Sequence, residues 1–406
     1  MEKQLLAFIV VAIIAAASGL SGADSSTMSI VWQRVQTAAT GGQFPSWTSY
    51  MKPVYDPFSA TTLWYNARGT STIIYSTDFF SYKASSRMWT RLGGTGSPIA
   101  TCSDGSTSTA IDGSPIVPWP SDRHPIEQLT IDTTRRRLYI AGGVCMNNTP
   151  NDTWYYALNG DPTSNRWTKV AISNVPTVQV SGSMEYSPAE DVIVLHGANF
   201  GNFPRTWVFC PVSTGASLSP TQTAAGCAAP NEWFQTYAPN VVEPAQSYFG
   251  SLVHVPGSGK MFHFGHDGTR GEVWAYDIRT KAWVNRNPAG QPTEPNTLSA
   301  PERLVAYIPF GGLAGKVFYH QTSHSSTTGL AADWIYDPAA NAWAALSTSG
   351  IGPQKLTYLA FDPSLGTNGT IVAFSYDGGL WHGTFQAGGG TVTPPPAAPS
   401  NLYIVR

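Results

Sequence analysis

Charged residues are scarce in this sequence. They make up 12% of its 406 residues, about half of the share that ordinary soluble domains carry. The formal net charge is only -2, too small to supply the attraction to phosphate backbones on which nucleic-acid-binding proteins depend. Neither DNA nor RNA is therefore expected as a partner.

Segments free of glycine and proline are also scarce, since the chain contains 39 glycines and 31 prolines. Helices need long runs without these two residues. The 14 tryptophans, 18 tyrosines and 17 phenylalanines belong to the residue types that strands favour. The composition therefore predicts an all-β protein with many short strands.

A long apolar run stands at the N-terminus. It extends from Leu5 to Ala17, follows Lys3 and precedes small residues, which is the layout of a secretory signal peptide cleaved after Ala17 or Ala23. The run is shorter than the ~20 residues of a spanning helix, and no cysteine follows it to receive a lipid. We predict a signal peptide over residues 1–23, no membrane span after cleavage, and a secreted, extracellular protein, or a periplasmic one in a bacterium.

Cysteine is rare as well, with four residues at positions 102, 145, 210 and 227. In an exported chain, four cysteines are expected to form two disulfides. The sequence alone permits three pairings.

An aromatic pattern recurs along the chain. An aromatic residue is followed two positions later by another and nine positions after the first by a tryptophan, as in Trp334, Tyr336 and Trp343. The pattern has two more copies with this spacing and two longer ones: Phe80, Tyr82 and Trp89; Trp274, Tyr276 and Trp283; Trp154, Tyr156 and Trp167; Trp207, Phe209 and Trp233. Such self-similarity predicts a repeat architecture.

Each unit is preceded by a strand, a turn and a second apolar strand, as in "QLTIDTTRRRLYIAGG", and this element occurs six times. Each unit therefore supplies four strands, an inner hairpin followed by an outer one. The sixth unit lacks its final tryptophan, but "SIVWQRV", with Trp32, lies near the N-terminus. We predict that this segment is the fourth strand of the last unit, so that the ring closes through its own termini and leaves only short edges. The recurring tryptophans are expected to pack between units.

This pattern resembles the kelch repeat over residues 29–388, and the pair Gly142 and Gly143 stands where kelch units carry a double glycine. The resemblance implies a six-bladed kelch-type β-propeller of the galactose oxidase central-domain superfamily, with its last blade closed by the N-terminal strand. Propellers serve many functions, so the fold alone does not define the activity.

In such a propeller, ligands usually meet the face formed by the loops before the first strand and after the second strand of each blade. The residues predicted there as ligand-binding candidates are Trp47, Arg68, Arg123, His196, Tyr248, His266, Asp267, His320 and His324. The same topology favours a disulfide between Cys102 and Cys145 on this face, and one between Cys210 and Cys227 within the outer hairpin of the third unit.

Three functions are open. A copper oxidase like galactose oxidase needs a Tyr–His pair and a cysteine; Tyr319, His320 and Cys210 are of the right types but occur on other strands than in that family. No metal and no cofactor are therefore predicted. The second function is mutarotase- or epimerase-like acid–base chemistry on a sugar, for which Glu127, His124 and Arg303 are the catalytic candidates.

The third function is binding without chemistry. Aromatic residues such as Trp47 and Tyr248 could stack on sugar rings, with arginine and histidine supplying hydrogen bonds. Residues 389–406 read as a Gly/Pro-rich linker whose end resembles the start of a fibronectin type III-like domain, as in modular surface proteins. We expect a monomeric recognition or scaffold module that binds a glycan or a cell-surface protein, with a sugar-directed enzyme as the alternative.

Overall fold

A computed structural model describes most of the repeat region. The described residues are 28–39, 52–65, 79–93, 108–109, 115–116, 120, 127–142, 152–158, 167–176, 182–197, 205–236, 243–244, 250–266, 271–292, 305–321, 332–349, 352–353, 356–375 and 379–387. The predicted signal peptide and C-terminal linker lie outside them, so those two predictions stay predictions.

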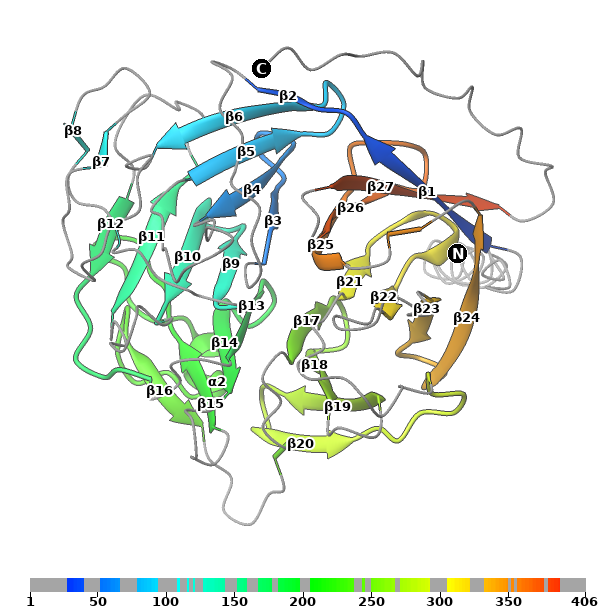
Figure 1. The fold of residues 1–406 in the computed structure, drawn as a ribbon. Helices are drawn as coiled ribbons and strands as arrows, with labels where there is room; N and C mark the ends of the chain where they lie inside the picture. The colour runs from blue at the N-terminus through cyan, green and yellow to red at the C-terminus, as the bar shows by residue number, and fades with distance from the viewer. Residues whose placement is uncertain are drawn as a thin grey trace, which may run out of the picture.

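The chain is an all-β protein whose strands form antiparallel groups of four (Figure 1). We number the groups 1 to 6 by the chain order of their first strands. Groups 2, 3 and 4 are separate four-stranded sheets. Their strands are β9 (Leu129–Asp132), β10 (Arg137–Ala141), β11 (Thr153–Ala157) and β12 (Trp167–Val170); β13 (Ser183–Ser187), β14 (Val192–Gly197), β15 (Arg205–Phe209) and β16 (Trp233–Thr236); β17 (Ser251–Val255), β18 (Lys260–His266), β19 (Gly271–Asp277) and β20 (Ala282–Asn285).

The other three groups are part of larger sheets. Group 1 has β3 (Val54–Asp56), β4 (Thr61–Tyr65), β5 (Phe79–Lys83) and β6 (Met88–Gly93); group 5 has β21 (Val305–Ile308), β22 (Lys316–Gln321), β23 (Ala332–Asp337) and β24 (Ala342–Ser349); group 6 has β25 (Leu356–Asp362), β26 (Thr370–Ser375), β27 (Leu380–Ala387) and β1 (Met28–Val35). The four strands predicted for each repeat are thus present in the predicted order.

The turn between the third and fourth strands explains the nine-residue aromatic spacing. In group 4, the carboxylate of Asp277 accepts hydrogen bonds from the backbone N–H groups of the next turn residues, and Lys281 then adopts a left-handed φ of 58°. In group 5, Asp337 accepts the corresponding backbone hydrogen bonds, and Asn341 adopts a left-handed φ of 51°. A turn of fixed length therefore places each tryptophan opposite the same position of the third strand.

The predicted pairing of the N-terminal strand with the last group is confirmed. β1 pairs antiparallel with β27 along its whole length, with Trp32 opposite Gly383. In addition, β1 pairs in parallel with the end of β24, from Ser347 to Ser349. This second pairing was not predicted, and it joins groups 5 and 6 into one sheet of eight strands instead of two separate blades. It forms because β24 continues beyond Trp343 and offers a free edge.

Four further elements were not predicted. The short strand β2 (Ala38–Ala39) lies parallel to β6 and adds a fifth strand to group 1. The strands β7 (Ser108–Thr109) and β8 (Pro115–Ile116) form a small hairpin. Helix α2 (Pro220–Ala225) lies between the third and fourth strands of group 3 and begins with a capping box formed by Ser219 and Gln222.

The first strands of the groups lie side by side in chain order. β3 contacts β9, β9 contacts β13, β13 contacts β17, and β17 contacts β21. β21 contacts β25, so the eight-stranded sheet nearly closes on itself, and β25 contacts β3. These six strands are the ones nearest the middle of the view in Figure 1.

The recurring tryptophans are buried, each on the fourth strand of its group. Five of the rings pack against aromatic or histidine rings of a neighbouring group, as in Trp167 with Phe79, Trp283 with His196, and Trp343 with Phe264. The sixth, Trp233, donates a hydrogen bond from its indole N–H to Thr153 of group 2. The prediction that these residues are packing residues is therefore confirmed for the part of each interface that the structure describes.

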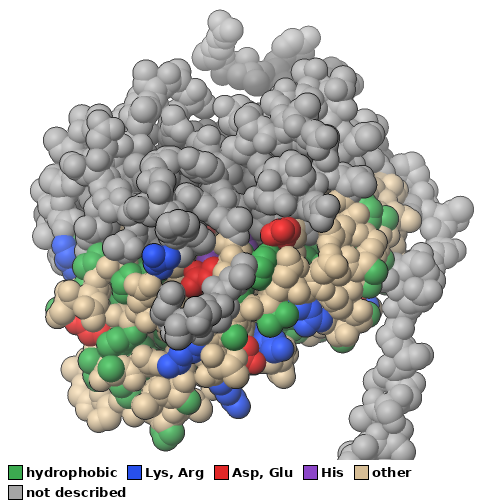
Figure 2. Space-filling model, turned by 90° about the horizontal axis from the view of Figure 1, so that it is seen from below, with side chains coloured by type: hydrophobic (Ala, Val, Ile, Leu, Met, Phe, Trp, Pro, Cys, Tyr) green, Lys and Arg blue, Asp and Glu red, His purple; other side chains and the backbone are tan. Residues whose placement is uncertain are grey.

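Charged side chains are scattered over the described part of the face shown in Figure 2. Basic and acidic side chains lie there among polar and hydrophobic ones. Among the described residues, no helix has the length and apolar character needed to cross a membrane.

Candidate functional site

The innermost strands of all six groups line a cavity of about 320 Å³. It runs along these strands to the turns that follow them, where exposed Pro57, Pro188 and Pro256 border it. Its size is at the lower end of the range for small-molecule sites in proteins. We refer to it as the central cavity.

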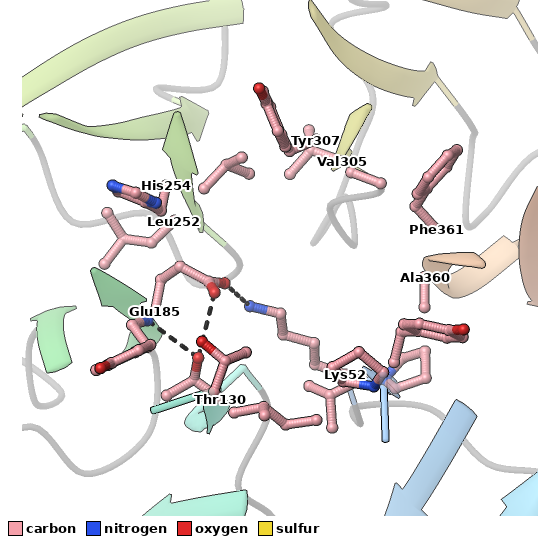
Figure 3. A pocket seen from close by; sticks show the side chains of 18 of the residues that line it. Lys52, Thr130, Glu185, Leu252, His254, Val305, Tyr307, Ala360 and Phe361 are labelled. Atoms are coloured by element: carbon pink, nitrogen blue, oxygen red, sulfur yellow. Dashed lines mark hydrogen bonds and ion pairs between the residues drawn. The ribbon is translucent and has the colours of Figure 1, made fainter. Parts of the chain in front are cut away.

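A lysine and a glutamate form the charged pair of the central cavity (Figure 3). The Nζ atom of Lys52, just before β3, lies 2.9 Å from a carboxylate oxygen of Glu185 on β13. Burial alone would lower the pKa of the Lys52 ammonium, but Glu185 and Glu127 together outweigh it and raise this pKa above its ordinary value. Lys52 is therefore a cation at neutral pH.

Glu185 is held in place by β9. Thr130 donates from its hydroxyl to the second carboxylate oxygen of Glu185 at 3.2 Å, while its own oxygen accepts from the backbone N–H of Tyr186 at 3.0 Å. The Glu185 carboxylate is held on one oxygen by Thr130 and on the other by Lys52. The charged pair is thus preorganised between three innermost strands.

Glu127, predicted as a catalytic candidate, is a buried anchor beside this pair. Its side chain is 2% exposed, and its two carboxylate oxygens accept from the hydroxyls of Ser251 at 2.6 Å and Ser183 at 3.1 Å. Glu127 thereby connects the start of β9 with β13 and β17. Glu127 and Glu185 are thus two carboxylates that both interact with the ammonium of Lys52.

His254 on β17 also borders the central cavity. Burial lowers the pKa of its imidazole, and the opposing effect of Glu185 and Glu190 does not cancel this. Its Nε2 atom lies 3.3 Å from the hydroxyl of Ser187, which donates to Glu190 at 2.6 Å. His254 is therefore neutral at neutral pH and adds hydrogen-bonding capacity without charge.

Aromatic rings form the other side of the central cavity. Tyr307 of β21 and Phe361 of β25 face the charged pair across it, and Tyr55 of β3 belongs to the same lining. The cavity thus combines flat apolar surfaces with a few fixed polar groups.

Three of the predicted site residues have described side chains: Glu127, His196 and His320. None of them lines the central cavity. For His266 only the backbone is described, at the end of β18. The remaining predicted residues lie outside the described residues: Trp47, Arg68, Arg123, His124, Tyr248, Asp267, Arg303 and His324.

His196 on β14 is packed between groups 3 and 4. It is 2% exposed, and burial lowers the pKa of its imidazole to about 3. Its Nδ1 atom lies 3.1 Å from the hydroxyl of Thr206, which also accepts a hydrogen bond from the indole N–H of Trp283. His196 is therefore neutral, and its described contacts are with side chains of the two sheets.

The imidazole of His320 on β22 lies within hydrogen-bonding distance of the carboxylate of Asp333 on β23. Nδ1 of His320 lies 2.7 Å from one carboxylate oxygen, and the other oxygen accepts from Trp32 at 2.9 Å and Thr348 at 2.8 Å. His320 is 1% exposed. Among the described residues, no group of three or more histidine, cysteine, aspartate or glutamate side chains has the arrangement of a metal site.

One predicted disulfide is confirmed. Cys210 and Cys227 are joined, with their Cα atoms 5.9 Å apart. Because the sulfur of Cys210 is bonded to Cys227, it is not available for the cross-link to tyrosine that a galactose oxidase-like copper site requires. Cys102 and Cys145 lie outside the described residues.

The residues of the central cavity were missed by sequence reasoning. A usable signal exists: Glu185 in "SMEYS" and His254 in "SLVHV" are ionisable residues within the innermost apolar strands, where packing alone does not call for them. The resemblance to kelch proteins predicts a site on the loops instead, because ligands usually meet that face in such propellers.

Comparison with protein-family models finds no match for the chain, and comparison with curated proteins finds no relative. The geometry of the site therefore carries the functional argument.

Proposed function

We propose that this chain is a six-bladed β-propeller of the kelch type that binds a saccharide in its central cavity. The ring of contacts from β3 through β25 and back to β3, and the closure by β1, support the propeller. The repeat spacing described above supports the resemblance to kelch proteins.

The observation that carries the binding proposal is the make-up of the cavity lining. Tyr55 and Tyr307 are half-buried and bring aromatic rings to the lining, on which the C–H groups of a sugar can pack. Lys52 and Glu185 present a fixed donor and acceptor. A saccharide needs both kinds of surface, since each of its rings has apolar faces and a polar edge.

The internal charge balance favours a neutral saccharide. The Lys52 ammonium is compensated by Glu185 and supported by Glu127, so it offers little attraction to an acidic sugar. The described catalytic candidate, Glu127, has both oxygens engaged by serine hydroxyls. This arrangement favours binding over the mutarotase-like alternative, in which a carboxyl group must exchange protons with the substrate.

A glycan array with the folded protein tests the proposal, followed by calorimetry on the best ligand. Tyr307→Ala and Glu185→Gln should each weaken binding by about tenfold or more, because each removes a ring face or a hydrogen-bonded charge. The matched control is Phe58→Ala, whose ring is 39% exposed on a turn and is not part of the cavity lining. Equal loss in all three variants, or turnover of the bound sugar, would contradict a binding role at this cavity.

We also propose that the protein is exported and acts as a monomer toward a glycan or a glycan-bearing surface protein. The disulfide between Cys210 and Cys227 supports an oxidising compartment. Mass spectrometry of the protein from its native host tests this; an uncleaved N-terminus together with reduced cysteines would contradict export.

A further inference from the structure

The turns that follow the first strands of groups 1 to 4 surround one end of the central cavity. The residues directly after these strands are Pro57, Thr133, Pro188 and Pro256, and all four border the cavity and are exposed. We refer to these four residues as the mouth. Proline fixes its backbone φ at about −65°, so three of the four mouth residues have little backbone freedom.

Hydrogen bonds within these turns also restrain the mouth. In group 1, the carboxylate of Asp56 accepts from the backbone N–H of Phe58, and in group 2, the carboxylate of Asp132 accepts from the backbone N–H of Thr134. In group 4, the hydroxyl of Ser258 donates to the backbone carbonyl of the last residue of β17. A ligand that enters the cavity at this end therefore passes an opening whose shape is set by the fold.

The walls of the central cavity come from the innermost strands of all six groups. A ligand inside is therefore surrounded by strands, and a linear polymer cannot lie across the cavity with an arm on either side. The volume of about 320 Å³ has room for about one or two sugar units. A longer saccharide must leave the cavity along the direction of the strands.

Contacts between strands occupy the other end, where the first strands begin. Glu127, just before β9, accepts from Ser183 and Ser251, which are the first residues of β13 and β17. The Nζ atom of Lys52, just before β3, lies 3.3 Å from the backbone carbonyl of Met184. These polar groups bind one another, whereas the residues of the mouth are exposed. Within the described part of the chain, the mouth is therefore the end at which a ligand meets the cavity.

We propose that the central cavity binds the terminal units of a linear neutral saccharide, which enters end-on through the mouth while the rest of its chain stays in solvent. This inference rests on the proposed function and adds the class of ligand, a chain with a free end. Glu185 lies three positions before Pro188, about 10 Å along an extended strand. Lys52 and Glu185 are therefore at the depth that an entering chain end reaches.

Binding capacity as a function of the number of chain ends tests the proposal. The probes are amylose, dextran, laminarin and mannan, each intact and after partial acid hydrolysis, which multiplies chain ends at constant mass. Calorimetry counts the protein bound per gram of saccharide. For every probe that binds, this count should rise in proportion to the number of chain ends and should not exceed one protein per end. If amylose binds, maltohexaose should bind and its ring-closed counterpart, α-cyclodextrin, should not.

Two cysteine variants test the direction of entry. Thr133→Cys is at the mouth, and Thr168→Cys is the matched control, because Thr168 is exposed on β12, the outermost strand of the same group. Each variant is coupled to a maleimide-linked polyethylene glycol, and wild-type protein treated in the same way is the blank. The polymer at position 133 should weaken binding of the hydrolysed chains by about threefold or more, because it competes for space at the mouth. The polymer at position 168 should leave binding unchanged.

Binding capacity that follows the mass of saccharide and not the number of its ends would overturn end-on entry, as would equal affinity for α-cyclodextrin and maltohexaose. Equal binding by the two polymer-coupled variants would overturn entry through this mouth. Each of these results leaves the proposed saccharide binding itself intact. Absence of binding to every probe, intact or hydrolysed, would instead contradict the proposed function together with this inference.

Discussion

Buried histidines connect the sheets of this molecule, and burial lowers the pKa of His196 and His382 most clearly. Burial lowers the pKa of His196 to about 3 from an ordinary 6.5. Burial, with a further contribution from Arg87, lowers the pKa of His382 to about 4. His382 lies on group 6 and pairs with the hydroxyl of Tyr82 on group 1 at 3.0 Å. Both side chains therefore resist protonation in the folded state.

The free energy of unfolding should depend on pH accordingly. Above pH 6.5 these imidazoles are neutral in both the folded and the unfolded chain, so they do not lower the free energy of unfolding there. As pH falls from about 6.5 toward 4, the unfolded chain binds protons that the folded chain does not, and each histidine lowers stability by about 1.4 kcal/mol per pH unit. Urea unfolding across this range measures the slope. His196→Phe should reduce it; the same slope in wild type and variant would contradict the assignment.

The hydrogen bond from Trp32 to Asp333 is a second feature at the residue scale. Trp32→Phe removes this donor from a buried carboxylate. It should lower the unfolding free energy by roughly 1.5–3 kcal/mol more than the replacement of an indole by a smaller phenyl ring does by itself. Trp343→Phe is the matched control, because Val273 occupies the place of Asp333 in group 4 and the indole nitrogen of Trp343 has no hydrogen-bond partner among the described residues. Chemical denaturation of both variants makes the comparison, and equal losses would argue against the bond.

Single residues were the hardest to predict. The sequence marks Glu127 as a catalytic candidate at the start of a first strand, yet it is anchored by Ser183 and Ser251 of two other groups. Burial of a carboxylate depends on donors far away in the chain, and no local pattern reveals them. His320 was marked as a site residue, but its partner Asp333 was not.

At the scale of elements, the disulfide segment of group 3 is the clearest case. The bond between Cys210 and Cys227 closes a segment that contains α2, and both cysteines belong to the core between groups 3 and 4. Replacing both by alanine should lower the unfolding free energy by about 3 kcal/mol, as expected for a loop of this length. Wild-type protein unfolded under reducing conditions should match the variant; a variant as stable as the oxidised wild type would contradict the estimate.

The strands were the most predictable elements, because the aromatic spacing and the recurring turns repeat through the chain. The pairing of β1 with β27 followed from a single missing tryptophan. The parallel pairing of β1 with β24 could not be predicted in this way, since it depends on how far β24 continues beyond Trp343. Helix α2 was missed because six residues are too few for a periodic signal.

At the scale of the whole molecule, the closure by β1 should decide whether the ring forms. Deleting residues 29–35 leaves β24 and β27 with unpaired edges and exposes the core residues that Ile30 and Trp32 cover. The deletion variant should unfold or oligomerise, and a peptide of residues 28–39 should restore a monomer. Size-exclusion chromatography with thermal melting reads this out; an unchanged monomer and melting curve would contradict the closure.

The central cavity could not have been predicted from local patterns. Lys52 and Glu185 are 133 positions apart in the chain and meet only because β3 and β13 reach the same centre. Their chemistry was visible in the sequence, but their proximity required the arrangement of all six groups.

The central claim is that the central cavity holds a neutral saccharide. A crystal structure of the protein with the best ligand from the glycan array tests this most directly. The account predicts a sugar ring against Tyr307 or Tyr55, with hydroxyls bonded to Lys52 and Glu185. A structure at comparable ligand saturation in which the sugar is bound elsewhere and the cavity holds only water would contradict it.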